Sequence, residues 1–120
     1  MIAQEISLAE ASYVIWLTDI KNDPVQKKIA EEKKPYKLQM LRDLASRLQP
    51  DDLVLDIGAQ VGNCTLYLAE TSSCRVVSIE ADKRNLEALE NSIKTNNLLG
   101  NVTLKTELPK LESFYNVAAI

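Results

Sequence analysis

Two short apolar runs, each carrying an acidic residue at or near its end, constrain the fold of this chain more than any other feature. Residues 53–57 read Leu-Val-Leu-Asp-Ile and precede Gly58, and residues 75–80 read Arg-Val-Val-Ser-Ile-Glu. Hydrophobic runs of this length are typical of strands buried on both faces, as in parallel sheets. Residues 61–70 lie between the runs and have a helical pattern. This alternation predicts an α/β fold with parallel strands, flanking helices and right-handed crossovers.

The alternation continues downstream. Asp82 can cap a helix on which Leu86, Leu89 and Ile93 share one face, the spacing of a helical core stripe. Residues 101–104 then predict a third strand, and residues 114–120 read as a further extended run. We predict that residues 51–120 form the first half of a sheet domain.

Upstream, residues 1–50 predict a helical segment that packs on the sheet. Asp23 followed by Pro24 is typical of a helix start and indicates a helix over residues 24–33. A second helix is expected between Pro35 and Pro50, because proline is tolerated at the first turn of a helix and stops one elsewhere.

The first twenty residues are ambiguous. Residues 13–17 read Tyr-Val-Ile-Trp-Leu and could form a short buried strand. Leu8, Ala11 and Ile15 could equally be the buried stripe of a helix. The sequence leaves both possibilities open.

Charge and hydropathy predict a chain without a nucleic-acid or membrane partner. The 120 residues carry a net charge of −3, with an isoelectric point near 5.0. Glu31 and Glu32 interrupt the densest basic cluster, which is typical of a solvated helix face. That cluster consists of Lys27, Lys28, Lys33, Lys34 and Lys37. Neither a basic leader nor a long apolar stretch opens the chain, so we expect a cytoplasmic protein.

Histidine is absent and the two cysteines, Cys64 and Cys74, do not have the spacing of metal ligands. A structural zinc site needs about four ligands, so no metal site is expected. Reduced, buried thiols are the simpler interpretation.

The turn after the first apolar run has the composition of a ligand-binding loop. Gly58 and Gly62 lie between a strand and a helix, where glycine lets a ligand approach the main chain. Glu80 follows Gly58 by 22 residues, and an acidic residue at that offset binds ribose hydroxyls in nucleoside-binding folds. Ligands of open α/β sheets bind at the carboxyl ends of the strands.

The loop composition favours a cation over a pyrophosphate. A dinucleotide fingerprint needs glycine where this chain has Gln60 and Asn63. Asp56 adds a negative charge, which suits a sulfonium carrying an ammonium group. A nicotinamide site and a ligand-free turn remain the alternatives.

Together these segments resemble the FkbM-type S-adenosylmethionine-dependent methyltransferases, which have a Rossmann-like fold. Residues 51–70 resemble the first motif of that family, and residues 76–96 resemble its second motif and the following helix. Lys34-Pro35-Tyr36 resembles its upstream segment. The resemblance covers roughly residues 23–104.

The resemblance implies S-adenosylmethionine as cofactor and assigns residues to it. Implied contacts with the amino-acid part are Asp56, Gly58, Ala59 and Gly62, with Asn63 and Thr65 lining the start of the next helix. Glu80 would hold the ribose hydroxyls, and Ala81 and Asp82 would border the adenosine. The implied reaction is O-methylation of a small-molecule or glycan hydroxyl.

Three positions depart from the family pattern, namely Gln60 in place of asparagine, Ala81 in place of proline and Lys37 in place of an acid. The later strands of the family have no counterpart here, so we expect a partial fold from a fragment and assign no catalytic base. Two alternatives stay open. One is an inactive cofactor-binding or interaction module that self-associates through an open sheet edge, and the other is a fragment of a nicotinamide-dependent oxidoreductase.

Overall fold

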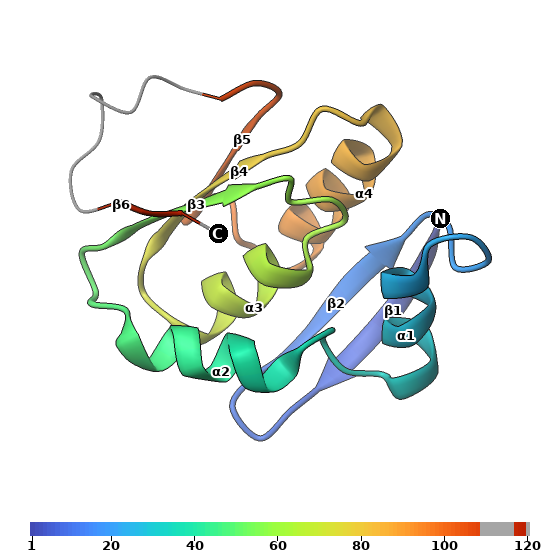
Figure 1. Ribbon diagram of the computed structural model, residues 1–120, viewed down its shortest axis with the longest axis horizontal. Helices are drawn as coiled ribbons and strands as arrows, with labels where there is room; N and C mark the ends of the chain where they lie inside the picture. Colours follow the sequence, from blue (N-terminus) through green and yellow to red (C-terminus); the bar gives the residue numbers. More distant parts are fainter. Residues whose placement is uncertain (109–116, 120) are drawn as a thin grey trace.

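A computed structural model describes residues 1–108 and 117–119 of the chain, with side chains described through residue 108. Figure 1 shows a sheet at one side, helices beside it and an N-terminal hairpin at the other side. The elements in chain order are β1 (Ile2–Ser7), β2 (Ser12–Leu17), α1 (Pro24–Glu32), α2 (Leu38–Arg47), β3 (Leu53–Ile57), α3 (Asn63–Thr71), β4 (Arg75–Ile79), α4 (Lys83–Thr95), β5 (Val102–Lys105) and β6 (Val117–Ala119).

The main sheet has the strand order β5-β4-β3-β6, and all its pairings are parallel. β3 and β4 pair in register from Leu53 opposite Arg75 to Ile57 opposite Ile79. The order matches strands 3-2-1-4 of a doubly wound sheet. The predicted α/β fold with parallel strands and flanking helices is confirmed.

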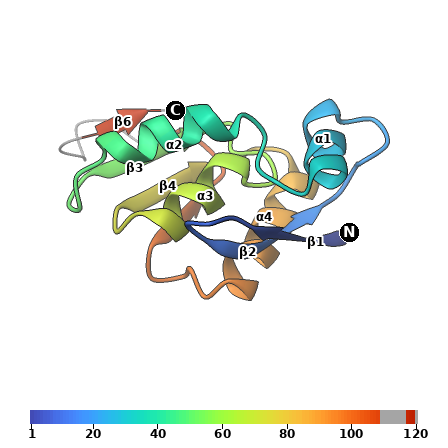
Figure 2. The same ribbon diagram turned by 90° about the horizontal axis from the view of Figure 1, so that it is seen from below.

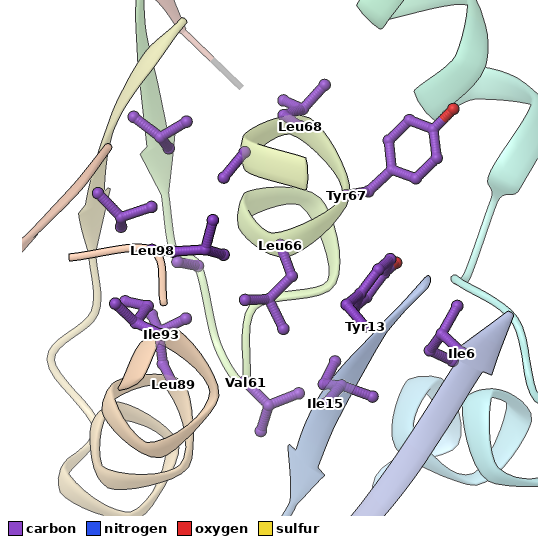
Figure 3. Close-up of a cluster of buried hydrophobic side chains, with 14 of the residues drawn as sticks. Ile6, Tyr13, Ile15, Val61, Leu66, Tyr67, Leu68, Leu89, Ile93 and Leu98 are labelled. Carbon is purple, nitrogen blue, oxygen red and sulfur yellow. The ribbon is translucent and has the colours of Figure 1, made fainter. Parts of the chain in front are cut away.

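The core lies between the sheet and one layer of helices. Figure 3 shows Leu66 of α3 between Leu89 of α4 and Ile15 of β2. Val54 and Val76 face this core from the sheet. Side chains alternate across a strand, so the neighbouring positions form a second buried cluster on the opposite face. Its members are Leu53, Leu55, Val77 and Ile79.

The prediction that residues 1–50 form a helical segment is correct only in part. β1 and β2 form an antiparallel hairpin, and only α1 and α2 are helices in this region. Tyr13, Ile15 and Leu17 are buried at every second position, the period of a strand. The helical interpretation of residues 1–20 is therefore wrong, and the strand interpretation of residues 13–17 is confirmed. The division of the chain near residue 50 remains a prediction.

Several predicted boundaries hold and others move by a few residues. Asp23 caps α1 and Asp82 caps α4, each accepting a main-chain N–H in the first turn. α2 begins at Leu38 rather than at Pro35, because Lys37 adopts a left-handed conformation with φ 55°. Of the extended run expected over residues 114–120, the structure describes β6, and the rest lies outside the described residues.

None of the described helices has the length and hydropathy needed to span a membrane.

Side chains of α4 and α1 complete the outer edge of β2. Asn96 accepts from the Val14 N–H at 2.9 Å and donates to the Val14 carbonyl at 2.7 Å. Ser92 accepts from the Trp16 N–H, and Gln26 accepts from the Thr18 N–H. Figure 2 shows β2 lying next to α4. An unpaired strand edge invites pairing with another chain, and these contacts occupy that edge.

We expect Asn96→Ala to lower the free energy of unfolding by about 1–3 kcal/mol, because the N–H and C=O of Val14 both lose their partner. Urea unfolding followed by circular dichroism measures the loss. Asn91→Ala in α4, the helix that Asn96 caps, is the control and should change stability by less than about 0.5 kcal/mol. Equal effects of the two variants would show that Asn96 does not anchor the hairpin.

A polar cluster fastens the tip of the hairpin to α2 and α3. Arg42 donates two hydrogen bonds to the Glu10 carboxylate, at 2.7 and 3.1 Å. The Tyr67 hydroxyl donates to the same carboxylate at 2.8 Å. These donors, Arg42 first, lower the pKa of Glu10 from 4.5 to about 2. The cluster therefore favours the charged carboxylate in the folded protein.

This shift predicts an acid-sensitive hairpin. A carboxyl group whose pKa is lowered by folding stabilises the fold above its unfolded pKa, and that stabilisation is lost as the pH falls through the folded value. For Glu10 the window runs from 4.5 down to about 2. Glu10→Gln should flatten the pH dependence of the melting temperature in this window. The control Glu5→Gln, at an exposed site on β1, should leave the dependence as in the wild type.

Candidate functional site

The predicted site residues gather where β3 and β4 end. The two strands are parallel and in register, so the loops that follow them leave the same edge of the sheet. β6 lies on the other side of β3, where the strand order reverses. Ligands of doubly wound sheets bind outside the carboxyl ends of the strands at this reversal point. The loop of residues 58–62 lies directly at this edge.

Main-chain hydrogen bonds hold the start of the loop against β4. The N–H groups of Gly58 and Ala59 both donate to the carbonyl of Ile79, at 2.9 and 3.0 Å. Gly58 has φ +72°, and a Cβ built on it meets no atom within 4 Å. The main chain at Gly58 is therefore open to close approach by a ligand.

Gly62 is required for a different reason. Its φ is +105°, and a Cβ there would lie 2.6 Å from Cδ1 of Leu89 and 3.3 Å from Cγ of Leu66. The missing side chain lets the first turn of α3 pack against α4. Packing alone thus explains this glycine, and its assignment to a cofactor loop remains a prediction.

The two glycines should respond differently to alanine. Gly62→Ala combines the positive φ with overpacking against Leu89. We expect it to lower the free energy of unfolding by about 2–4 kcal/mol. Gly58→Ala has only the backbone penalty and should cost about 1 kcal/mol. Urea unfolding of both variants compares the two losses. A larger loss for Gly58→Ala than for Gly62→Ala would contradict this description of the loop.

Glu80 joins the two loops. One carboxylate oxygen accepts from the main-chain N–H of Gln60 at 2.7 Å, and the other accepts from the N–H of Asp82 at 2.8 Å. Glu80 is 8% exposed, so these hydrogen bonds fix its orientation at the sheet edge. An ionised carboxylate has about four acceptor positions. Each oxygen can therefore accept a further hydrogen bond from a ligand hydroxyl.

Asp56 lies beneath the loop and is almost completely buried, with 4% exposure. The Thr65 hydroxyl in the first turn of α3 donates to it at 2.6 Å and lies 2.6 Å from the Ser78 hydroxyl. Burial raises the pKa of Asp56, hydrogen bonds from Thr65 lower it, and the nearby Glu80 charge raises it. Asp56 therefore anchors the start of α3 and places a titratable charge under the loop.

Asn63 and Tyr36 tie the upstream segment to α3. The Asn63 side chain accepts from the Tyr36 N–H at 2.8 Å and donates to the Tyr36 carbonyl at 2.9 Å. Both ends of its amide are thus occupied by main-chain partners. Asn63 positions the segment of residues 34–37 beside the loop.

The remaining predicted residues, Ala81 and Asp82, are exposed at the end of β4. Asp82 also accepts from the Asn85 N–H at 3.1 Å and so caps α4. Sequence reasoning missed Ser78 and the main-chain role of Gln60. A polar residue inside the apolar run of β4 was the available signal for Ser78. Residues 1–108 contain no group of three or more side chains suited to hold a metal ion.

Comparison with known proteins gives one sequence relative and many structural ones. No family model matches the chain. A mitochondrial ribosomal RNA small subunit methyltransferase of Arabidopsis thaliana is 34% identical over 74 residues, which are 57% of this chain and 19% of that protein. The chain thus spans about a fifth of the length of this relative.

Structural neighbours cover more of the chain. TYW2 of P. horikoshii, solved with MeSAdo, has a TM-score of 0.63 at 19% identity and covers 89% of this chain and 38% of its own. A 16S rRNA methyltransferase of T. thermophilus, solved with AdoMet and guanosine, has a TM-score of 0.62 at 25% identity, over 88% of this chain and 27% of its own. A precorrin methyltransferase of Geobacter metallireducens has a TM-score of 0.56 at 20% identity, over 82% and 47%.

These comparisons correct one prediction and leave another untested. The prediction that nucleic acid is excluded as a partner is wrong. It was inferred from the net charge, whereas relatives of this chain are named as ribosomal RNA methyltransferases. The FkbM subtype is not shown and remains a prediction. The fold of this chain is the partial Rossmann-like fold that S-adenosylmethionine-dependent methyltransferases share.

Proposed function

We propose that this chain binds S-adenosylmethionine at the carboxyl ends of β3 and β4 and belongs to a methyltransferase. The main support for this proposal is the Glu80 carboxylate. It joins the loops that follow β3 and β4, and it keeps acceptor positions for a ligand. The complexes of the structural neighbours with AdoMet or MeSAdo support the same ligand.

The residues around this carboxylate fit the parts of the cofactor. Glu80 would accept hydrogen bonds from the ribose hydroxyls, and the open main chain at Gly58, followed by the buried Ala59, would border the amino-acid part. Asp56 places a buried carboxyl group beside the loop, and its ionised form would attract the sulfonium and ammonium charges. Ala81 and Asp82 are exposed where the adenosine would lie.

Bound S-adenosylmethionine supplies an electrophilic methyl group for transfer to a nucleophile. The chain's own contribution is positioning, because in-line transfer depends mainly on holding the reactants in the right geometry. The hydrogen bonds from Gly58 and Ala59 to Ile79 and from Gln60 to Glu80 set the loop before a ligand arrives. No residue among those described is assigned as a general base.

The geometry disfavours a nicotinamide cofactor. A pyrophosphate needs free main-chain N–H groups in the glycine loop. The N–H of Gln60, at the second fingerprint position, is already bound to the Glu80 carboxylate. Both Glu80 and Asp56 would repel a phosphate at this place.

Two classes of methyl acceptor are proposed. RNA is supported by the names of the ribosomal RNA methyltransferases that resemble this chain. The second class, a small-molecule or glycan hydroxyl, is supported by the resemblance to FkbM-type enzymes. An assay with tritiated methyl groups on total RNA and on hydroxyl compounds separates the two. Binding of S-adenosylhomocysteine without any transfer would favour a cofactor-binding module.

Calorimetric titration tests the site. Wild-type protein should bind S-adenosylhomocysteine and not NAD. Glu80→Gln should weaken this binding at least tenfold, because one carboxylate oxygen becomes an amide donor that faces an N–H. The control Glu87→Gln makes the same chemical change at an exposed site on α4 and should bind as the wild type does.

Two results would refute the assignment. One is a folded wild-type protein that binds neither compound. The other is an unchanged affinity of Glu80→Gln for S-adenosylhomocysteine, which would place the ligand away from this carboxylate.

A further inference from the structure

A surface pocket of about 430 Å³ lies where the chain passes from α1 to α2. Its size is within the range of ligand-binding sites. Residues of the end of α1, the connecting segment and the start of α2 line it, including Lys28, Lys34, Tyr36 and Lys37. The function proposed above makes no use of this pocket.

The lysines of this region belong to the only strongly basic part of an acidic chain. Residues 27–37 contain five lysines and two glutamates and carry +3, whereas the chain as a whole carries −3. Sequence reasoning interpreted these lysines as a solvated helix face. The structure instead distributes them over α1, its C-cap Lys33 and the connecting segment.

The charges of these lysines remain available to a ligand. Lys28 and Lys34 both approach Glu32, at 3.8 and 3.6 Å, and all three side chains are at least 36% exposed. Exposed ion pairs of this kind are weak and are screened by salt. Lys37 makes no ion pair with a carboxylate among residues 1–108 and lies 5.6 Å from the centre of the Tyr36 ring.

Tyr36 is held in place by its main chain. Asn63 binds both its N–H and its carbonyl. Lys33 and Lys37, on either side of the segment, have positive φ values of 56° and 55°. Such values are uncommon for lysine and mark a defined turn. The half-buried aromatic ring is thus presented in the pocket from a fixed main chain.

Asn63 also links this pocket to the proposed cofactor site. It is the first residue of α3 and directly follows the loop of residues 58–62. We infer that the pocket of Lys28, Lys34, Tyr36 and Lys37 binds single-stranded RNA next to the cofactor loop. This inference rests on the proposed methyltransferase function and names its acceptor class.

Single-stranded RNA matches both kinds of side chain found here. Lysines neutralise its phosphates, and an aromatic ring stacks on an unpaired base. Complementary charge brings a polyanion to this segment and not to the acidic remainder of the chain. The ribosomal RNA substrates named for two relatives agree with this partner.

Fluorescence anisotropy with a labelled 12-nucleotide RNA of mixed sequence, measured at several salt concentrations, tests the inference. Lys34→Gln/Lys37→Gln should weaken binding at least tenfold and reduce the slope of log K against log salt by about 1.4, at about 0.7 per lost phosphate contact. Tyr36→Leu should weaken binding severalfold and leave the slope unchanged, because it removes an aromatic ring and no charge.

The matched control is Lys21→Gln/Lys94→Gln, which removes two charges outside the pocket. It should bind RNA within twofold of the wild type. All variants should bind S-adenosylhomocysteine as the wild type does, which separates this test from that of the cofactor site. Thermal melting confirms that each variant is folded.

The inference is overturned if both double variants lose RNA binding equally, or if neither does. It is also overturned if wild-type protein binds phosphatidylserine vesicles but not the RNA. Failure of the wild type to bind S-adenosylhomocysteine, with RNA binding intact and dependent on Lys34 and Lys37, would remove the proposed function and leave the RNA site.

Discussion

The parallel, in-register pairing of β3 with β4 is the constraint on which the site depends. It brings the end of β3, with Gly58, beside the end of β4, with Glu80. The carbonyl of Ile79 then receives two N–H groups from the loop, and the Glu80 carboxylate receives a third. A shift of the register by one residue would turn each side chain to the other face of the sheet and separate these partners.

Asp56 shows how fold and site share the same residues. It is buried, its pKa is raised by that burial, and its hydrogen bond with Thr65 fastens the start of α3. Burial of a carboxyl group of this kind lowers the stability of the fold. A buried titratable group at the edge where ligands bind is a candidate functional residue. Gly62 is the opposite case, because packing against Leu89 accounts for it without a ligand.

The N-terminal hairpin depends on α4 for its integrity. Asn96 and Ser92 occupy main-chain groups on the outer edge of β2. Glu10 at the hairpin tip is held by Arg42 and Tyr67. The same side of the molecule carries the segment between α1 and α2, which Asn63 connects to the start of α3. Residues far apart in sequence thus join the N-terminal segments to the helices of the core.

The sequence by itself determined the central α/β unit. Apolar runs, the caps Asp23 and Asp82, and the glycine loop are local patterns, and each predicts its element without knowledge of the rest. It also placed Glu80 at a strand end next to that loop, because parallel strands end at the same edge. The strands, caps and turns are predicted correctly because their causes lie within a few residues of each other.

Tertiary structure decided what depends on distant partners. Residues 1–20 suit either a helix or a strand, and the contact of β2 with α4 selects the strand. The family resemblance places Asn63 at the start of the helix beside the cofactor, whereas the structure pairs it with Tyr36, 27 residues upstream. Lys28, Lys34 and Lys37 line one pocket because the chain turns at Lys33 and Lys37. Sequence spacing cannot show such contacts, because the folded chain sets them through long-range packing.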